Sequence, residues 1–246
     1  MRKKANDNIL DIELLVLSGG QGTRLASVWA DKPKVLAPIA GRPYFDWYVE
    51  AMQGEGFQRF CFLLGMGADQ VVDHISNRSD RGSFRYLVED RPLGTGGAIK
   101  NAFLAMDEER VFVANGDSYC RFDYGAMFRN HLEMNADCTI GLAYVDDSSD
   151  YGSVEFGDNL RVKGFNEKGD RTDGSFVNAG VYLLERRCSR FFPKNDSFSL
   201  EREVFQNISD EGRLFGYKSE GDLLDIGTPD RLSAAQSELA RLITER

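Results

Sequence analysis

Histidine is scarce in this chain, and no cysteine pair has the CxxC spacing of a zinc or redox site. The two histidines, His74 and His131, do not lie at the intervals of zinc ligands. We therefore expect no zinc centre. The cysteines are interpreted as four reduced, mostly buried thiols of a cytoplasmic protein: Cys61, Cys120, Cys138 and Cys188.

Long apolar runs and an excess of basic residues are also absent. A run such as Cys61–Leu64 is far shorter than the roughly 20 residues that span a bilayer, and no apolar segment of a secretory signal follows the first eight residues. The 39 acidic residues outnumber the 30 lysines and arginines, which gives a formal net charge of −9. Because a nucleic-acid groove usually has the opposite charge balance, we expect a cytoplasmic protein with no membrane or nucleic-acid partner. A local basic pocket for a small anion is still compatible with this charge.

The first half of the chain alternates short apolar runs with segments of helical periodicity. The runs predict buried strands at Glu13–Ser18, Phe60–Leu64, Ser83–Glu89 and Val111–Ala114. Helices are predicted at Tyr44–Gln53 and from about Ala98. The alternation predicts an α/β fold, a Rossmann-like, doubly wound and mostly parallel sheet, in which ligands bind beyond the carboxyl ends of the strands.

The second half has a different pattern, with strands joined by short polar connections. We expect a small mixed or antiparallel subregion that covers a pocket, built from Thr139–Tyr144, Ser153–Phe156, Arg161–Phe165 and Phe176–Leu184. A helix near Leu200–Asn207 and a strand at Asp222–Ile226 follow. The last helix has Thr228 as N-cap and Pro229 at its first position. Its apolar face either packs on the sheet or forms an interface between copies in a homo-oligomer: Leu232, Ala235, Leu239 and Leu242.

A glycine-rich loop follows the first predicted strand and reads LSGGQGTRL. The backbone N–H groups of Gly19, Gly20 and Gly22 can converge on an anion, and Arg24 and Lys34 supply cations close by in the sequence. The loop lacks the GK[ST] ending of a P-loop. It also lacks the third glycine of the dinucleotide fingerprint, since Leu25 stands there, which counts against a nicotinamide-dependent dehydrogenase.

The loop and six further motifs, in the same order, resemble the nucleotide-sugar pyrophosphorylases. GGQGTRL and the later proline–lysine pair are followed by LGTGGAIK, NGD, YGSVEF, NEK, VNAGVY and DIGTP. Within this family the chain is most similar to guanylyltransferases that act on D-glycero-D-manno-heptose 1-phosphate. That finer resemblance depends on LGTGGAIK, on FSLEREVF at Phe198–Phe205 and on DIGTPDRL.

The resemblance implies a GT-A-like nucleotidyltransferase fold in one domain, residues 1–246, with no second domain. We expect residues 1–12 to be a flexible tail, about 13–120 to bind the nucleotide, and about 121–246 to bind the sugar and include the C-terminal helix. In the reaction, a sugar 1-phosphate attacks the α-phosphorus of a nucleoside triphosphate and pyrophosphate leaves. The attacking phosphate is already ionised, so the protein must supply cations and a metal rather than a general base.

Two aspartates follow predicted strands and suit Mg²⁺, which keeps several waters and takes substrate phosphates as ligands. Asp117 and Asp225 match the family's metal positions. Arg24, Lys34 and Lys168 would hold phosphates, although Gly169 replaces the proline that usually follows the family's lysine.

The resemblance also implies the remaining contacts to substrates. Those to the sugar would come from Gly152, Glu167, Asn178 and Gly180. Those to the nucleotide would come from Leu17, Gly19, Gly20, Gly22, Thr23, Glu89, Gly94, Thr95 and Gly116.

Glu89 favours guanine among the bases. A carboxylate only accepts hydrogen bonds, and guanine presents two adjacent donors, its N1–H and its exocyclic amine. A glutamine, common about here in relatives that take thymidine or uridine triphosphate, suits the imide edge of those bases instead. Gly94, Gly96 and Gly97 would let the backbone approach the base plane. The alternative is that Asp90 or the backbone reads the base.

We therefore expect GTP and D-glycero-α-D-manno-heptose 1-phosphate as substrates, with Mg²⁺ as cofactor and GDP-heptose, a precursor of capsule or lipopolysaccharide, as product. GTP with mannose 1-phosphate, or UTP with N-acetylmuramate 1-phosphate, would use the same chemistry. A non-catalytic regulatory subunit is disfavoured because Arg24, Lys34 and both aspartates are present.

Overall fold

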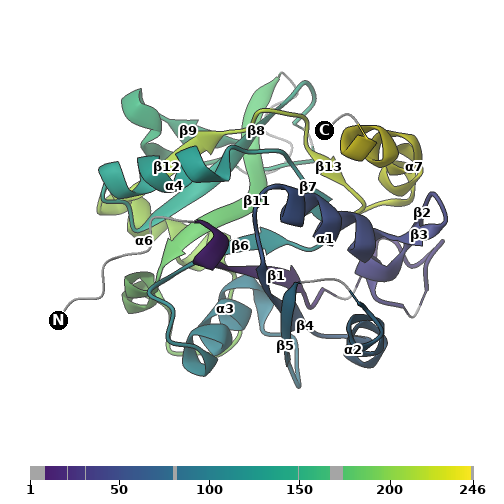
Figure 1. The fold of residues 1–246 in the computed structure, drawn as a ribbon. Helices are drawn as coiled ribbons and strands as arrows, with labels where there is room; N and C mark the ends of the chain where they lie inside the picture. Colours follow the sequence, from purple (N-terminus) through teal and green to yellow (C-terminus); the bar gives the residue numbers. More distant parts are fainter. Residues whose placement is uncertain are drawn as a thin grey trace.

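A seven-stranded sheet forms the centre of the computed structural model, which describes residues 9–20, 22–30, 32–79, 82–148, 150–166 and 174–244 (Figure 1). The strand order is β12-β8-β11-β6-β1-β4-β5. The strands are β1 (Glu13–Ser18), β4 (Arg59–Leu64), β5 (Ser83–Val88), β6 (Arg110–Asn115), β8 (Cys138–Val145), β11 (Ser175–Glu185) and β12 (Leu214–Lys218). Only β11 runs against its neighbours β6 and β8, so the predicted mostly parallel sheet is confirmed.

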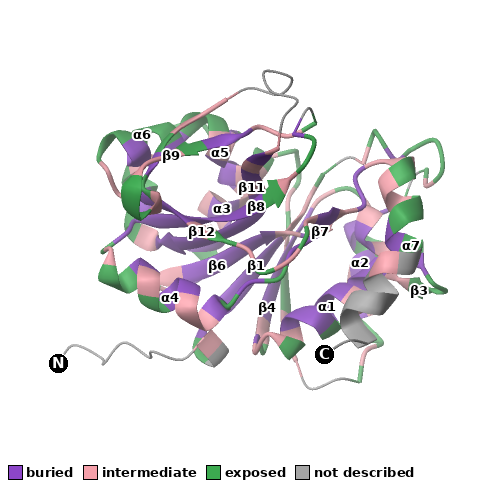
Figure 2. Ribbon diagram, turned by 90° about the horizontal axis from the view of Figure 1, so that it is seen from above, coloured by how far each residue is buried: buried purple, intermediate pink, exposed green. Residues whose placement is uncertain are grey.

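Side chains alternate between the two faces of the sheet, and both faces are buried (Figure 2). On β1, Leu14 and Val16 join one core cluster and Leu15 joins the other. Burial on both faces explains why the central strands appear in the sequence as continuous apolar runs.

Helices cover each face. One cluster includes side chains of α1 (Tyr44–Gly54), α2 (Ala68–Ser76), α4 (Tyr124–Glu133) and α7 (Pro229–Thr244). The other includes side chains of α3 (Gly94–Ala105), α5 (Leu200–Glu203) and α6 (Phe205–Asp210). None of the helices in the described ranges is long and apolar enough to cross a membrane.

Three two-stranded antiparallel sheets complete the fold. They are β2 (Pro38–Ile39) with β3 (Arg42–Pro43), β7 (Ser118–Tyr119) with β13 (Leu224–Asp225), and β9 (Val154–Phe156) with β10 (Val162–Phe165). The β7–β13 pair matters most for function, because it joins the end of the first half of the chain to the segment before α7.

Two expectations from the sequence need correction. Of the expected N-terminal tail, residues 9–12 are folded: Ile9–Asp11 form a 3-10 turn, and Ile12 is buried in the core cluster on one face of the sheet. The helix expected from about Ala98 begins at Gly94, for a reason given by the site below.

The C-terminal helix begins as predicted. Thr228 Oγ1 accepts the Arg231 N–H at 3.4 Å, and Pro229 is the first helical residue. Ala235 is fully buried and Leu232 packs against the same core, so this part of the apolar face packs inside the molecule. All four cysteines are buried and unpaired, as expected.

Candidate functional site

A cavity of about 330 Å³ opens where β1, β5 and β6 end. The carboxyl ends of neighbouring parallel strands lie at one edge of a sheet, so the residues that follow them meet there. Nine of the residues singled out from the sequence line this cavity: Leu17, Gly19, Gly20, Lys34, Glu89, Gly94, Thr95, Gly116 and Asp117.

A second, more polar cavity of about 180 Å³ adjoins the first, and Asn115 and Asp117 line both. Its other lining residues include Arg24, Asn178 and Asp225, also singled out from the sequence. The two cavities therefore form one continuous site, with Asp117 at the boundary.

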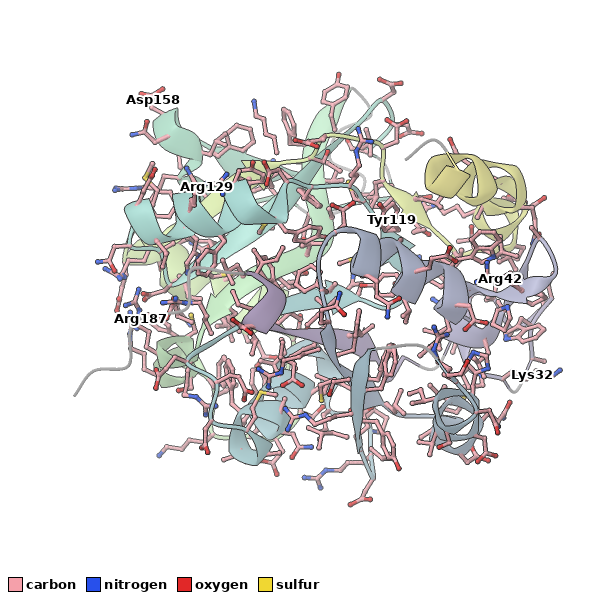
Figure 3. All side chains as sticks on the ribbon, viewed as in Figure 1. Lys32, Arg42, Tyr119, Arg129, Asp158 and Arg187 are labelled. Atoms are coloured by element: carbon pink, nitrogen blue, oxygen red, sulfur yellow. The ribbon has the colours of Figure 1, made fainter. Side chains whose placement is uncertain are left out.

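The two predicted metal ligands lie on paired strands. Asp225 of β13 lies opposite Ser118 of β7, and the Ile226 N–H donates to the Asp117 carbonyl at 2.9 Å. Backbone pairing thus fixes Asp117 and Asp225 side by side, although 108 positions separate them (225 − 117). Tyr119, labelled in Figure 3, lies on β7 next to Ser118 and pairs with Leu224 of β13.

Each of the two carboxylates already has a cationic partner. Lys34 Nζ donates to Asp117 Oδ2 at 2.7 Å, and Arg231 donates to Asp225 Oδ2 at 2.9 Å. The Tyr151 hydroxyl also donates to Asp225 Oδ2, at 2.6 Å. Burial, and then this hydrogen bond, raise the pKa of Tyr151, so its proton stays in place as a donor.

The donor set fits Mg²⁺. No group of three or more histidine, cysteine, aspartate or glutamate side chains gathers within the described parts of the chain, which disfavours an all-protein metal cage there. Two carboxylates beside a hollow suit an ion that takes its other ligands from water and substrate phosphates.

Lys34 and Lys32 differ in position although only one proline separates them. The Lys34 side chain is mostly buried and faces Asp117. Lys32 projects outward at the edge of the molecule, with its Nζ 4.7 Å from the centre of the Trp29 ring (Figure 3). Of this pair, Lys34 is therefore the lysine that lines the first cavity.

The Glu89 carboxylate lies between the glycine loop and α3. Its Oε2 accepts the Leu93 N–H at 3.2 Å, and its Oε1 would lie 2.7 Å from a Cβ built on Gly19. Any side chain at position 19 would therefore displace the carboxylate. Burial raises the pKa of Glu89, and the hydrogen bond from Leu93 opposes part of that rise.

The glycines of the LGTGG turn have a different use from the one expected. Cβ atoms on Gly96 and Gly97 would collide with the Phe198 ring and with the Asp196 carbonyl, at 2.2 and 2.1 Å, and so would not point into the cavity. The Phe198 carbonyl accepts the N–H groups of Gly96 and Gly97 at 3.0 and 3.3 Å. The helix can begin at Gly94 because this distant carbonyl satisfies donors of its first turn.

Some predicted contacts fall outside the two cavities. Gly22 and Thr23 lie in the turn after the loop, and a Cβ built on Gly152 would lie 3.1 Å from the Asn166 carbonyl; none of the three is among the residues that line a cavity. The Gly180 N–H, a backbone group that we expected to serve the sugar, donates to Asn178 Oδ1 at 2.9 Å in this structure. Glu167 and Lys168 lie outside the described residues.

The sequence interpretation missed three residues of the second cavity: Arg231, Tyr151 and Asp150. Arg231 donates to Asp225 and, at 2.8 Å, to Asp150, and its guanidinium lies 4.6 Å from the centre of the Tyr151 ring. The signal was present, since Arg231 lies in the first turn of the helix that directly follows the DIGTP motif, and Tyr151 opens the YGSVEF motif.

The fold and site define a class: an α/β protein whose glycine loop, cations and paired aspartates line two adjoining cavities at the end of a mostly parallel sheet. The chain belongs to the nucleotidyl transferase family, whose model matches residues 13–241.

Individual relatives narrow the comparison. The chain is 33% identical to a D-glycero-alpha-D-manno-heptose 1-phosphate guanylyltransferase of Aneurinibacillus thermoaerophilus, over 94% of this chain and all of that protein. It is 30% identical to a mannose-1-phosphate guanylyltransferase of Mycobacterium tuberculosis, over 94% of this chain and 65% of that protein. The crystal structure of HddC from Yersinia pseudotuberculosis superimposes with a TM-score of 0.83 at 32% identity, covering 92% of this chain and 99% of that one. HddC has also been solved in complex with GMP-PN.

Proposed function

We propose that this protein is a sugar-1-phosphate guanylyltransferase that joins GTP to D-glycero-α-D-manno-heptose 1-phosphate and releases pyrophosphate. The observation that carries the proposal is the arrangement of Glu89 and the Lys34–Asp117 pair around a single cavity, with the second cavity beyond Asp117. That order matches the order of groups in the reaction: a guanine at Glu89, phosphates at Lys34, and a sugar 1-phosphate on the far side. The relatives named above as guanylyltransferases support it.

The division of labour follows from the two cavities. Residues 13–120 would bind the nucleotide through the glycine loop, Glu89, Gly94, Thr95 and Gly116. Residues 121–246 would bind the sugar through Asn178, which lines the second cavity, and, as the family resemblance implies, through Glu167 and Lys168. The whole chain would then act as one nucleotidyltransferase domain.

The chemistry needs positive charge and alignment rather than a base. A sugar phosphate oxygen bonds to the α-phosphorus while the bond to the pyrophosphate oxygen breaks, and no proton has to move. Lys34 would turn from Asp117 to the triphosphate, and Arg24 would contact phosphates at the boundary of the two cavities. Mg²⁺ held by Asp117 and Asp225 would supply further positive charge beside the phosphates.

The Lys34–Asp117 pair also holds the site ready before substrate arrives. Its lysine and carboxylate neutralise each other at 2.7 Å, so neither charge is left unpaired in a partly buried place. When substrate binds, the triphosphate would pair with Lys34 and the metal would pair with Asp117, so two ion pairs would replace one.

A pyrophosphate-release assay with Mg²⁺ tests the proposal. Four nucleoside triphosphates are crossed with heptose, mannose, glucose and N-acetylmuramate 1-phosphates, and Asp117→Asn serves as the inactive control. The expected result is release with GTP and the heptose phosphate. Turnover with UTP or dTTP would contradict the base assignment.

Mannose 1-phosphate with GTP is the second candidate, favoured by the relative that is named for that activity. The two sugars differ by one exocyclic carbon, so the ratio of kcat/KM for the two phosphates decides between them. A ratio in favour of mannose 1-phosphate would overturn the heptose assignment and leave guanylyl transfer in place.

A further inference from the structure

The segment Asp196–Glu201 packs directly on the LGTGG turn, Leu93–Gly97. The Phe198 N–H donates to the Leu93 carbonyl at 2.9 Å, and the Phe198 carbonyl accepts the Gly96 and Gly97 N–H groups. Backbone therefore lies against backbone, with no side chain between. A shift of this segment must move the start of α3, and with it Gly94 and Thr95, which line the first cavity.

Within this segment, Glu201 accepts hydrogen bonds from three hydroxyl groups. Thr95 Oγ1 and Ser199 Oγ donate to Glu201 Oε2 at 2.6 and 2.7 Å. The Tyr182 hydroxyl donates to Glu201 Oε1 at 3.1 Å. Thr95 Oγ1 accepts the Leu200 N–H at 2.9 Å in turn, which fixes the position of the threonine. One carboxylate thus accepts from three donors, and an amide in its place would present an NH₂ donor to at least one of them.

The same hydrogen-bonded chain continues into the second cavity. Asn178 Nδ2 donates to the Tyr182 hydroxyl oxygen at 3.0 Å, and Asn178 Oδ1 accepts the Gly180 N–H. Burial raises the pKa of Tyr182, with the charge of Glu201 the next cause, so the phenol keeps the proton that it donates. Because that proton points to Glu201, the tyrosine oxygen is free to accept from Asn178, and this sets which way the Asn178 amide faces.

Thr95 lines the nucleotide cavity and Asn178 lines the second cavity, while Glu201 lines neither. We propose that Glu201 is a positioning residue that sets both substrate pockets at once, through Thr95 on the nucleotide side and through Tyr182 and Asn178 on the sugar side. The effect of Glu201 on the two KM values rests on the proposed function, whereas the hydrogen-bonded linkage from Thr95 to Asn178 does not depend on it.

Replacement of Glu201 by glutamine tests the linkage with almost no change of volume. An amide has one acceptor oxygen and one donor NH₂ group, so at least one of the three hydroxyls loses its acceptor. The matched control is Glu203→Gln, on the same short helix. Glu203 is exposed, and its side chain accepts the Ser199 N–H at 3.0 Å, a bond that the amide oxygen can keep.

The first measurement is amide hydrogen exchange of the full-length protein without substrate. In Glu201→Gln we expect faster exchange at Gly96–Gly97 if the NH₂ group faces Thr95, or at Gly180 if it faces Tyr182. The Glu203→Gln protein should exchange like the wild type at both. Wild-type exchange at both places in Glu201→Gln overturns the proposal.

The second measurement is the KM for each substrate. The side of the linkage that meets the NH₂ group of Glu201→Gln loses its hydrogen bond, which should raise the KM of the substrate on that side about tenfold. Tyr182→Phe removes only a hydroxyl and leaves Thr95 bonded to Glu201. It should therefore raise the KM for the sugar phosphate by a similar factor and leave the KM for GTP within about twofold.

This split separates positioning from general structural damage, which would lower kcat and raise both KM values in every variant. Equal effects of Tyr182→Phe on the two substrates, or wild-type KM values in Glu201→Gln, would overturn the proposal. If the wild-type protein turns over no pair of substrates, the proposed function is wrong, and the exchange measurement still decides the linkage. If Glu201→Gln does not fold, the Tyr182→Phe split decides.

Discussion

Replacement of Glu89 by glutamine should remove the preference for guanine while leaving the protein folded. The glutamine oxygen can keep the Leu93 N–H that Glu89 Oε2 now accepts at 3.2 Å, which turns the NH₂ group toward the cavity. Two guanine donors would then face a donor. Hydrogen bonds to charged groups contribute about 1.5–3 kcal/mol each, so we expect a loss of about 3 kcal/mol in kcat/KM for GTP, roughly a hundredfold.

Unfolding should not account for this loss. Burial raises the pKa of Glu89, which means that the ionised carboxylate is less favourable in the folded protein than in the unfolded chain. A neutral glutamine removes that cost, so the variant should be at least as stable as the wild type at pH 7. Because the pKa of Glu89 is raised, the carboxylate takes up a proton at a higher pH than a free glutamate does. The preference of the wild type for GTP should therefore weaken as the pH falls toward that pKa.

The assay compares kcat/KM for GTP, ITP and UTP. ITP lacks the exocyclic amine, so the wild type should prefer GTP to ITP and Glu89→Gln should not. The matched control is Asp90→Asn, the exposed neighbouring acid, which should keep the wild-type ratios. Unchanged ratios in Glu89→Gln, together with altered ratios in Asp90→Asn, would refute the reasoning and assign base recognition to Asp90.

Three further predictions concern packing and charge. Gly97→Ala places a Cβ 2.1 Å from the Asp196 carbonyl and should lower the free energy of unfolding by about 1–3 kcal/mol in urea titrations. The control Gly125→Ala meets only ordinary contacts and should not lower it. Equal losses of stability in the two variants would contradict the packing argument. Burial alone would raise the pKa of Asp137, but hydrogen bonds from three arginines hold it below its usual range, so Asp137→Asn should cost about 3 kcal/mol at pH 7. That difference should shrink as the pH falls below about 4, and a constant difference would exclude the charge as its cause. Burial lowers the pKa of His131, and the partner Glu185 only partly opposes this. The free energy of unfolding of the wild type should therefore fall as the pH drops below about 6.5, because the unfolded chain takes up a proton that the folded protein resists. His131→Gln should lack this part of the pH dependence of stability, and the same pH dependence in both proteins would contradict the assignment to His131.

The sheet was predictable because its strands carry the signal within themselves. The runs at Glu13–Ser18 and Phe60–Leu64 are apolar on both faces, which is the pattern of a parallel strand covered by helices on either side. The residues that follow such strands meet at one edge, so local patterns alone suffice to bring the glycine loop, Glu89 and Asp117 together.

The start of α3 and the pairing of Asp117 with Lys34 were not predictable in this way. Gly94–Gly97 has poor helix propensity, and the carbonyl that satisfies its first-turn donors comes from Phe198, about a hundred positions away. Arg231 reaches Asp225 only because α7 begins directly after the β7–β13 pair. The start of α3 and the pairing of Asp117 with Lys34 depend on contacts between distant segments, to which local patterns give no access. The Arg231–Asp225 contact spans only six positions, and its signal was local.

The central claim is that an oxygen of the sugar phosphate forms the new bond to the guanylyl phosphorus. The most direct test supplies heptose 1-phosphate labelled with oxygen-18 in its phosphate, together with unlabelled GTP and Mg²⁺, and analyses the products by mass spectrometry. We predict GDP-heptose that retains the label, and pyrophosphate that carries none. Label in the pyrophosphate, or GMP and unchanged heptose 1-phosphate as the products, would contradict the account.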